Sequence, residues 1–400
     1  MRITVRSGDT FWRYSQLFRV PLYLIEDSNP GVNPLNLVPG ATVEIPGYVT
    51  AEHRVVQGDS LWQIARNRGI PLETLFLLNP DINPNALQIG QIIRVPVRVT
   101  WPVVQAQQPQ RPYDSNALAA DLNRLTNVYP FIRRRSIGTS VLGKDIAELR
   151  IGRGSKRVHV NGAFHANEWI TSPLLVRFLN EYALALTVGG TIRGLVMEPY
   201  YLNAMLSAVP MVNPDGVDLV INGPPEQQPY RDRVREINGG SDDFSGWKAN
   251  IRGVDLNDQF PALWELEVAR SPQKQPAPRD YPGTAPLTEP EAVAMAQLTR
   301  ESDFARVLAF HTQGEVIYWG FQNLEPPESE RLVNEFARVS GYVPIRNIES
   351  YAGYKDWFIQ DWRRPGFTIE AGRGVNPLPL SQFEEMYQKC LGILLASLYA

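Results

Sequence analysis

The chain has 400 residues, of which 44% are hydrophobic and 20% charged, and its formal net charge is -3. This composition is that of two or three globular domains, and it excludes a polybasic surface for nucleic acid or a membrane. The apolar segment LGILLASLYA is too short to cross a bilayer, and the start MRITVRSGDT lacks the apolar stretch of a signal peptide. The single cysteine, Cys390, excludes an internal disulfide, and we expect an inert thiol buried in a helix.

A repeat with a period of 50 residues fills the N-terminal quarter of the chain. VRSGDTFW recurs as VVQGDSLW, and NPGVNP recurs as NPDINP. Thr10 and Ser60 stand where the first helix of each copy needs an N-cap, and the Asn-Pro pairs stand where the second helix ends. Each copy therefore predicts a strand, two helices and a second strand, at residues 1–48 and 51–97.

These residues carry a family resemblance. GDSLWQIARNRGIPLETLFLLNPDINP with the closing IGQIIRVP resembles the LysM domain, which binds N-acetylglucosamine-containing glycans such as peptidoglycan and chitin. The first copy departs further from this pattern, and a repeat that serves only for spacing or packing is the alternative. Duplication of a weak binder favours glycan binding through avidity. The expected glycan contacts are Asp9, Thr10, Asn29, Pro30, Asp59, Ser60, Asn79, Pro80 and Ile82.

The rest of the chain predicts a linker and one larger domain. Residues 98–112, RVTWPVVQAQQPQRP, contain prolines and glutamines without periodicity, which is typical of an extended linker. Over residues 113–400 strands and helices alternate, which favours an α/β domain around a mixed sheet covered on both faces. The expected helices are DSNALAADLNRLTNVY, opened by Asp114, NEWITSPLLVRFLNEYALAL, TEPEAVAMAQLTRES, with a capping box of Thr288 and Glu291, and SQFEEMYQKCLGILLASLYA. The expected strands are KRVHVNGAF, LSAVPMV, RVLAFHT and FTIEA.

Four side chains in this domain predict a metal site. His165 and Glu168 form a His-x-x-Glu motif between a strand and a helix, which can direct both side chains to one point. His311 ends RVLAF and Glu370 ends FTIE, so both lie at the carboxyl edge of the sheet, where open α/β sheets bind ligands. Because zinc accepts imidazole and carboxylate ligands, His165, Glu168 and His311 predict one zinc ion, with Glu370 as general base for its water. The alternatives are a hydrogen-bonded histidine at a strand end and a structural ion pair for Glu370.

From about residue 113 to the end, the chain resembles the zinc carboxypeptidases, the M14 metallopeptidases. FHANEWITSP resembles the first zinc motif of that family, and FHTQGE the segment of the third ligand. VNPDGVDL, WKANIRGVDLNDQFP, SYAGYKDW and FTIEAG resemble further segments of the family. The resemblance implies an α/β fold with a central mixed eight-stranded sheet, zinc on His165, Glu168 and His311, and Glu370 as the base.

The resemblance also implies groups that stabilise the oxyanion and cover the substrate. Family members hold an arginine after the tryptophan of this segment, where this chain has Lys248. Arg252 is close enough in sequence to be the positive donor instead, so both stay candidates and Lys248 is preferred. Tyr351 matches, across a short gap, the mobile tyrosine over the substrate.

One departure from the family changes the expected specificity. The arginine that grips a C-terminal carboxylate is replaced in the pair Asn257-Asp258, and Asp258 would repel such a carboxylate. Lys355 stands where family members carry the base of the specificity pocket; a buried cation there favours an anionic group, and a solvated surface lysine is the alternative. Asp258 and Lys355 would match the ammonium and carboxylate that end the side chain of diaminopimelic acid.

Together with the tandem LysM units, these motifs are most similar to γ-D-glutamyl-L-diamino acid endopeptidases of sporulating Gram-positive bacteria. The resemblance implies a zinc-dependent peptidoglycan hydrolase that cleaves the γ-D-glutamyl–diaminopimelate bond of stem peptides. The alternatives are a metallocarboxypeptidase that trims muropeptide C-termini, an inactive wall-binding protein, and a chitin binder whose peptidase acts on proteins. We expect the protein at the cell wall or spore, or in the cytoplasm during sporulation because no signal peptide is visible.

Overall fold

The computed structural model describes all residues from Met1 to Ala400, and the chain divides into two compact units. One unit comprises Met1–Val103, Asn123–Arg133 and Asn180–Met197, and the other Val104–Leu122, Arg134–Leu179 and Glu198–Ala400. None of the helices combines the length and the apolar character that a membrane span requires.

The two N-terminal repeats have the predicted βααβ order. The first consists of β1 (Arg2–Thr4), α1 (Phe11–Phe18), α2 (Leu22–Ser28) and β2 (Thr42–Glu44). The second consists of β3 (Tyr48–Arg54), α3 (Leu61–Asn67), α4 (Leu72–Leu78) and β4 (Ile92–Arg98). In each repeat the two strands pair in antiparallel fashion.

Local capping explains where the first helix of each repeat begins. The Thr10 hydroxyl accepts a hydrogen bond from the Arg13 amide and the Ser60 hydroxyl from the Gln63 amide, both at 3.1 Å. Both N-cap predictions are therefore confirmed. The second repeat has a small core, in which Val55, Leu61, Ile64, Ala65, Leu75, Ile93 and Val95 form one buried cluster, so we expect it to be modestly stable.

The larger unit is built on a mixed sheet of eight strands in the order β13-β12-β14-β11-β7-β10-β6-β5. The central strands β14, β11, β7 and β10 run parallel, whereas β6 and β12 are antiparallel to their neighbours β10 and β14. Their bounds are β5 (Arg133–Thr139), β6 (Asp145–Ile151), β7 (Lys156–Gly162), β10 (Ala204–Val209), β11 (Arg306–His311), β12 (Val316–Tyr318), β13 (Val343–Ile345) and β14 (Gly366–Glu370).

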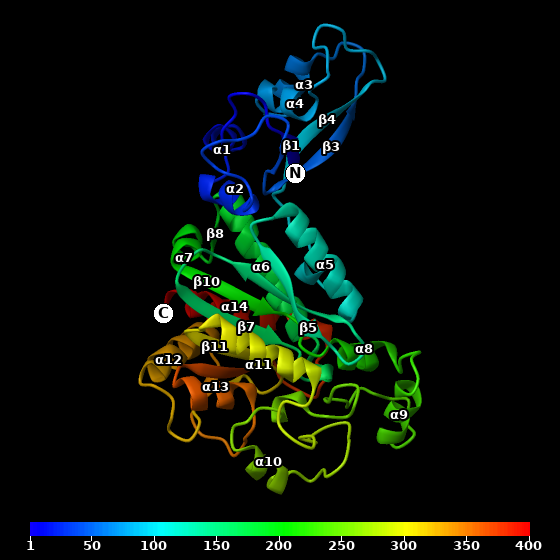
Figure 1. The fold of residues 1–400 in the computed structure, drawn as a ribbon, viewed down its shortest axis with the longest axis vertical. Coiled ribbons are helices and arrows are strands. Elements are labelled where there is room, and N and C mark those ends of the chain that lie inside the picture. Colours follow the sequence, from blue (N-terminus) through cyan, green and yellow to red (C-terminus); the bar gives the residue numbers. More distant parts are fainter. The chain divides into compact units, whose positions relative to one another are not determined.

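Helices cover both faces of this sheet (Figure 1). On one face lie α6 (Thr171–Val188), α12 (Glu328–Ser340) and α14 (Phe383–Tyr399), and on the other α11 (Pro290–Ser302) and α13 (Tyr354–Trp362). Arg177 of α6 stacks on Tyr387 of α14 at 3.7 Å, and the Thr299 hydroxyl of α11 shares a hydrogen bond with the Tyr354 hydroxyl of α13 at 2.8 Å. The remaining elements are η1 (Gln105–Gln107), α5 (Ser115–Val128), η2 (Ala166–Glu168), β8 (Thr191–Ile192), β9 (Leu195–Val196), α7 (Glu198–Asn203), α8 (Pro214–Asn222), α9 (Tyr230–Ile237), η3 (Leu256–Asp258), α10 (Trp264–Arg270) and η4 (Leu380–Gln382).

The predicted strands of this unit are confirmed as β7, β10, β11 and β14, but one helix start is misplaced. The helix predicted from Asn167 begins at Thr171, because residues 166–168 form a tight 3-10 turn. Within the predicted linker, residues 105–107 also form a 3-10 turn, and the amides of Gln105 and Ala106 donate to Asp121 at 2.8 Å.

The predicted capping box of α11 is wrong. The Thr288 hydroxyl bonds to the Gln259 side chain at 3.0 Å rather than to the first turn of the helix. The Glu291 carboxyl is buried and accepts from the Val141 amide at 3.0 Å. Both side chains therefore bond to groups distant in the sequence rather than to each other's backbone amides. By contrast, Asp114 does open α5, because its carboxylate accepts from the Ala117 amide at 2.8 Å.

Candidate metal centre and catalytic site

Strand order explains why residues far apart in sequence meet at one edge of the sheet. His165 follows β7, His311 is the last residue of β11, and Glu370 is the last residue of β14. These three strands are parallel neighbours, so their carboxyl ends lie side by side. Glu168 ends the turn η2 and reaches the same point, which places the ligand atoms of His165, Glu168 and His311 within 4.8 Å of one another.

The geometry of this triad fits one zinc ion. His165 Nδ1 lies 2.8 Å from Glu168 Oε1, His311 Nδ1 lies 2.9 Å from Glu168 Oε2, and the two Nδ1 atoms are 3.2 Å apart. Ligands about 2.0–2.1 Å from a tetrahedral zinc ion are themselves about 3.3 Å apart. All three side chains are buried. A small contraction or expansion of the triad therefore accommodates the metal.

The charges around the triad also favour a cation. Burial alone lowers the pKa of His165, but the carboxylates of Glu168 and Asp255 raise it to about 10. Burial raises the pKa of Glu168, yet the two histidines hold it well below its usual range. These groups stabilise positive charge at the point where their ligand atoms converge.

Three further residues, none of them among those predicted from the sequence, hold the triad in place. Asp255 Oδ1 accepts from His165 Nε2 at 3.2 Å, which turns Nδ1 toward the centre. The Thr312 amide donates to Glu168 Oε2 at 3.3 Å, and Asn376 Nδ2 donates to Glu168 Oε1 at 3.4 Å. Such partners orient metal ligands and tune their basicity.

The signals for these supporting residues differ. Asp255 lies in the segment VDLND, two residues before Asn257, so the substrate-binding motif itself indicates it. Asn376 stands in a loop after β14 and reaches Glu168 only in the folded chain, where its side chain also bonds to Thr312 at 2.7 and 2.9 Å. No local pattern could have found it.

Glu370 lies next to the triad. In the sheet register it is the partner of His311, and its carboxylate has no hydrogen-bond partner in the chain. Burial, together with the negative charge of Glu168, raises the pKa of Glu370 to about 8. The side chain is partly exposed. A raised pKa makes this carboxylate a stronger base, which suits it to accept a proton from water.

Of the two candidates for the oxyanion donor, the structure brings only Lys248 to the metal centre. Its Nζ lies 3.7 Å from Asp255 Oδ2 and 3.8 Å from Asp280 Oδ1, and its carbonyl accepts from the Ala166 amide beside the metal motif. Burial lowers the pKa of Lys248, but the negative charges of Asp255 and Glu168 outweigh this effect and raise the pKa above its usual value. The amine therefore stays charged. Arg252 instead points to Glu289, at 3.5 Å.

Asp258 presents a carboxylate that the chain leaves unpaired. It accepts no hydrogen bond and forms no ion pair. Burial raises the pKa of Asp258 well above its usual range, and the charges of Asp255 and Glu267 add to this shift. Its neighbour Asn257 accepts from the Tyr354 amide at 3.4 Å, which ties this segment to the start of α13.

Lys355 lies in the first turn of α13, and Tyr351 lies three residues before this helix begins. Lys355 is only 5% exposed, which rules out the alternative of a solvated surface lysine. Its amine donates to the Gly320 carbonyl at 2.9 Å and pairs with Asp356, so the buried cation already has an anionic partner. Tyr351 is partly buried, and its amide donates to Glu267 at 2.9 Å.

Four of the expected glycan contacts have structural roles within the LysM repeats. The Asp9 carboxylate accepts from the Tyr14 hydroxyl at 2.7 Å, and the Asp59 carboxylate accepts from the Val56 amide at 2.9 Å and bonds to His53 at 2.9 Å. The Asn29 and Asn79 side chains connect the second helix of each repeat to its second strand.

The other expected glycan contacts face solvent. Thr10, Ser60, Pro30 and Pro80 are exposed, and Ile82 is partly exposed. In the second repeat, a cavity of about 330 Å³ is lined by Leu78, Asn79, Pro80, Asp81, Ile82, Gln91, Ile92 and Arg94.

Comparison with known proteins agrees with this geometry. The family model described as zinc carboxypeptidase matches residues 118–385, and the LysM domain model matches residues 3–46 and 53–96. The chain belongs to the zinc carboxypeptidase family. It is thus a metallopeptidase that carries two LysM domains, and the expected family and fold are confirmed.

The relatives of this zinc carboxypeptidase family member differ in how much of the chain they match. It is 63% identical over 399 residues, and over 100% of both chains, to γ-D-glutamyl-L-diamino acid endopeptidase 1 of Lysinibacillus sphaericus. It is 26% identical to Bos taurus carboxypeptidase B over 276 residues, which are 63% of this chain and 61% of the relative. Bovine thrombin-activatable fibrinolysis inhibitor, solved with a tick carboxypeptidase inhibitor, has the same fold, with a TM-score of 0.56 at 19% identity over 73% of this chain and 97% of that one.

Proposed function

We propose that this metallopeptidase hydrolyses the γ-D-glutamyl–diaminopimelate bond of peptidoglycan stem peptides, with one zinc ion held by His165, Glu168 and His311. The observation that carries the proposal is the unpaired carboxylate of Asp258 beside an intact ligand triad. The chain is also 63% identical, over its whole length, to a γ-D-glutamyl-L-diamino acid endopeptidase.

The residues around the triad divide the chemistry among them. When bound, zinc supplies a Lewis acid that polarises the scissile carbonyl and lowers the pKa of a water molecule. Glu370, the register partner of His311, takes the proton of the attacking water and returns it to the leaving amine. Lys248 offers a fixed positive charge to the oxyanion, and Asp255 holds His165 in position.

Asp258 determines which peptides fit. A substrate with a free C-terminal carboxylate at this point would face a second carboxylate, whereas the side-chain ammonium of diaminopimelate would neutralise Asp258. Asn257 and Tyr351 are the neighbouring groups that we assign to the bound peptide. We assign Lys355, which is buried and paired with Asp356, to the carboxylate that ends the same side chain. Lys355→Ala should then reduce the cleavage of diaminopimelate-containing substrates more than that of other peptides. An equal loss of cleavage on all peptides would count against this role.

The LysM domains hold the enzyme on the glycan strands of the cell wall or spore wall. The exposed Thr10, Ser60, Pro30 and Pro80 and the cavity at Ile82 offer the glycan surface, whereas Asp9, Asp59, Asn29 and Asn79 shape the turns that carry it. Two sites on one chain increase the time that the enzyme spends near its substrate.

The test is mass spectrometry of defined tripeptide and tetrapeptide muropeptides after incubation with the full chain, with and without a chelator. We expect a cut between D-glutamate and diaminopimelate, loss of the cut with the chelator, and a fall in kcat on the order of 10²- to 10⁴-fold for Glu370→Gln. Release of only the terminal residue of the tetrapeptide, with the D-glutamyl–diaminopimelate bond left intact, would show a carboxypeptidase instead. Wall binding without any product would show an inactive wall-binding protein.

A further inference from the structure

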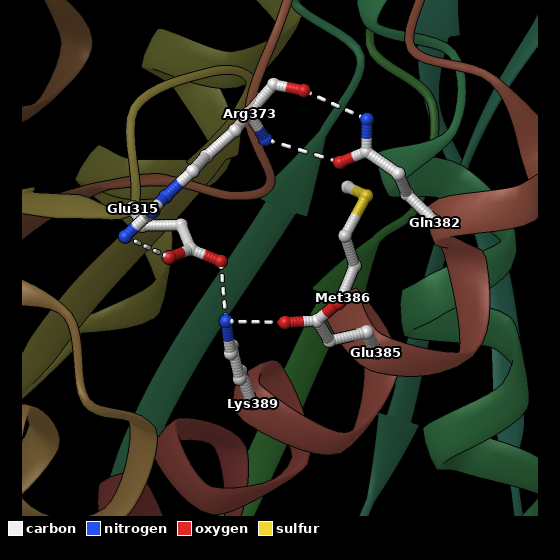
Figure 2. A pocket seen from close by; sticks show the side chains of 6 residues that line it. All are labelled: Glu315, Arg373, Gln382, Glu385, Met386 and Lys389. Carbon is white, nitrogen blue, oxygen red and sulfur yellow. Dashed lines mark hydrogen bonds and ion pairs between the residues drawn. The ribbon is translucent and has the colours of Figure 1, made fainter.

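A second polar cavity lies at the same edge of the sheet as the metal centre. It has a volume of about 360 Å³, and Figure 2 shows the side chains that line it: Glu315, Arg373, Gln382, Glu385, Met386 and Lys389. Glu315 stands four residues after His311, and Arg373 three residues after Glu370, so two catalytic strands lead directly into this cavity. The other lining residues belong to η4 and α14.

The charges in this cavity leave one guanidinium available to a ligand. The Glu315 side chain is only 10% exposed, and it pairs with Arg373 at 2.7 Å and with Lys389 at 2.5 Å. Lys389 also pairs with Glu385 at 2.8 Å. The Arg373 side chain is 76% exposed. Because a guanidinium has five N–H donors, Arg373 keeps free donors after bonding to Glu315 and can receive a carboxylate.

The backbone that presents Arg373 is held firmly. The Arg373 amide donates to Gln382 Oε1 at 3.1 Å, and Gln382 Nε2 donates to the Arg373 carbonyl at 2.7 Å (Figure 2). One residue further, the Gly374 amide donates to the Gln313 side chain at 3.4 Å. Asn376 then connects the same loop to the metal ligand Glu168. A loop fixed at these points presents its cation at a defined place relative to the metal centre.

The position of the cavity indicates which half of the substrate it meets. The Tyr354 amide donates to Asn257, which ties the Asn257-Asp258 segment to the start of α13, whereas Arg373 lines its cavity together with residues of α14. The helices α13 and α14 cover opposite faces of the sheet (Figure 1). A peptide whose diamino acid lies at Asp258 therefore extends its acyl half toward Arg373. The three residues from Glu370 to Arg373 span at most about 11 Å, so a group a few bonds from the scissile carbonyl is within reach of the guanidinium.

We propose that Arg373 binds the free α-carboxylate of the γ-D-glutamyl residue and thereby selects γ-linked substrates. This inference rests on the proposed function. A glutamyl residue that is linked through its side-chain carboxyl keeps its α-carboxylate ionised, and this group lies on the acyl side of the cut. Glu315, Lys389 and Gln382 are positioning residues that hold Arg373.

The experiment compares two muropeptides, one with D-glutamate and one whose α-carboxylate is a carboxamide, as substrates of the full chain. We expect Arg373→Gln to lower kcat/KM for the carboxylate substrate on the order of 10- to 100-fold and to leave kcat/KM for the carboxamide unchanged. Arg373→Lys should retain part of the preference for the carboxylate substrate over the carboxamide. Arg338→Gln is the matched control, because Arg338 is a similarly exposed, ion-paired arginine on α12.

The outcomes separate the two proposals. Equal losses on both substrates, or no loss on either, would overturn the role of Arg373 while the endopeptidase activity stands. If the wild-type chain does not cut the γ-D-glutamyl bond in either substrate, both proposals fail. Since Lys389 still neutralises Glu315 in Arg373→Gln, we expect that variant to fold and to retain its metal, which zinc analysis and a melting curve check.

Discussion

Asp255→Asn is the substitution that best separates support of the metal ligands from the ligands themselves. Asp255 is 2% exposed and accepts four contacts: from His165 Nε2 at 3.2 Å, the Asn257 amide at 3.1 Å, the Asp280 amide at 3.2 Å, and Lys248 Nζ at 3.7 Å. Asparagine preserves the size of the side chain but removes its charge and one acceptor. His165 would then have a weaker partner opposite the metal, and Lys248 would keep only the more distant Asp280.

The expected magnitude follows from the single hydrogen bond to His165. Loss of an anionic partner behind a ligating histidine typically weakens metal binding 10- to 100-fold, or about 1.4–2.8 kcal/mol. A competition titration against a chromogenic zinc chelator measures this change in wild type and variant. Asp280→Asn is the matched control, because Asp280 also faces Lys248 but makes no contact with His165. Unchanged zinc affinity in Asp255→Asn, or an equal loss in both variants, would refute the reasoning.

Three other substitutions test separate parts of the molecule. Lys248→Met should lower kcat on the order of 10²- to 10³-fold in a muropeptide assay, because Lys248 lies at the metal centre. Arg252→Met should have little effect on kcat, because Arg252 points to Glu289. A larger loss of kcat in Arg252→Met than in Lys248→Met would exchange their roles. Burial raises the pKa of Glu291 from 4.5 to about 7, so the unfolded chain releases this proton at a lower pH than the folded chain does. Between these two pH values the free energy of unfolding of the wild type should therefore fall by about 1.4 kcal/mol per pH unit. Denaturant titrations of Glu291→Gln should lack this fall, and a pH slope identical to that of the wild type would count against the reasoning. Asn79→Ala removes two hydrogen bonds to Arg94 of the second strand and one to the Leu75 carbonyl of the second helix. It should lower the free energy of unfolding of that repeat by about 2–4 kcal/mol in thermal unfolding, whereas Asn85→Ala at an exposed turn should not.

The sequence predicts well those features that depend on strand ends and short repeats. His165, His311 and Glu370 each end or follow an apolar strand, and parallel strands bring such positions to one edge whatever the details of packing. The N-caps Thr10 and Ser60 act within three residues, so the local pattern contains everything that decides them. Both kinds of prediction are reliable because the chain direction of the strands and the local capping bonds do not depend on a distant side chain.

The features that the sequence misses are those in which a distant partner decides. Thr288 and Glu291 have the spacing of a capping box, but Gln259 and the Val141 amide bind them instead. Asn376 contacts Glu168 across more than two hundred residues, and no periodicity or spacing indicates such a contact. The sequence favours a buried cation at Lys355 but does not predict its pairing with Asp356.

The zinc content of the purified chain tests the metal centre most directly. We predict one zinc ion per chain in the wild type and in the control variant His53→Ala. The imidazole of His53 lies in the second LysM domain, which holds none of the triad residues, and bonds to Asp59. We predict a large loss of zinc in His311→Ala, with the fold intact by circular dichroism. A folded His311→Ala chain that still binds one zinc ion as tightly as the wild type would contradict the assignment of the triad and the mechanism built on it.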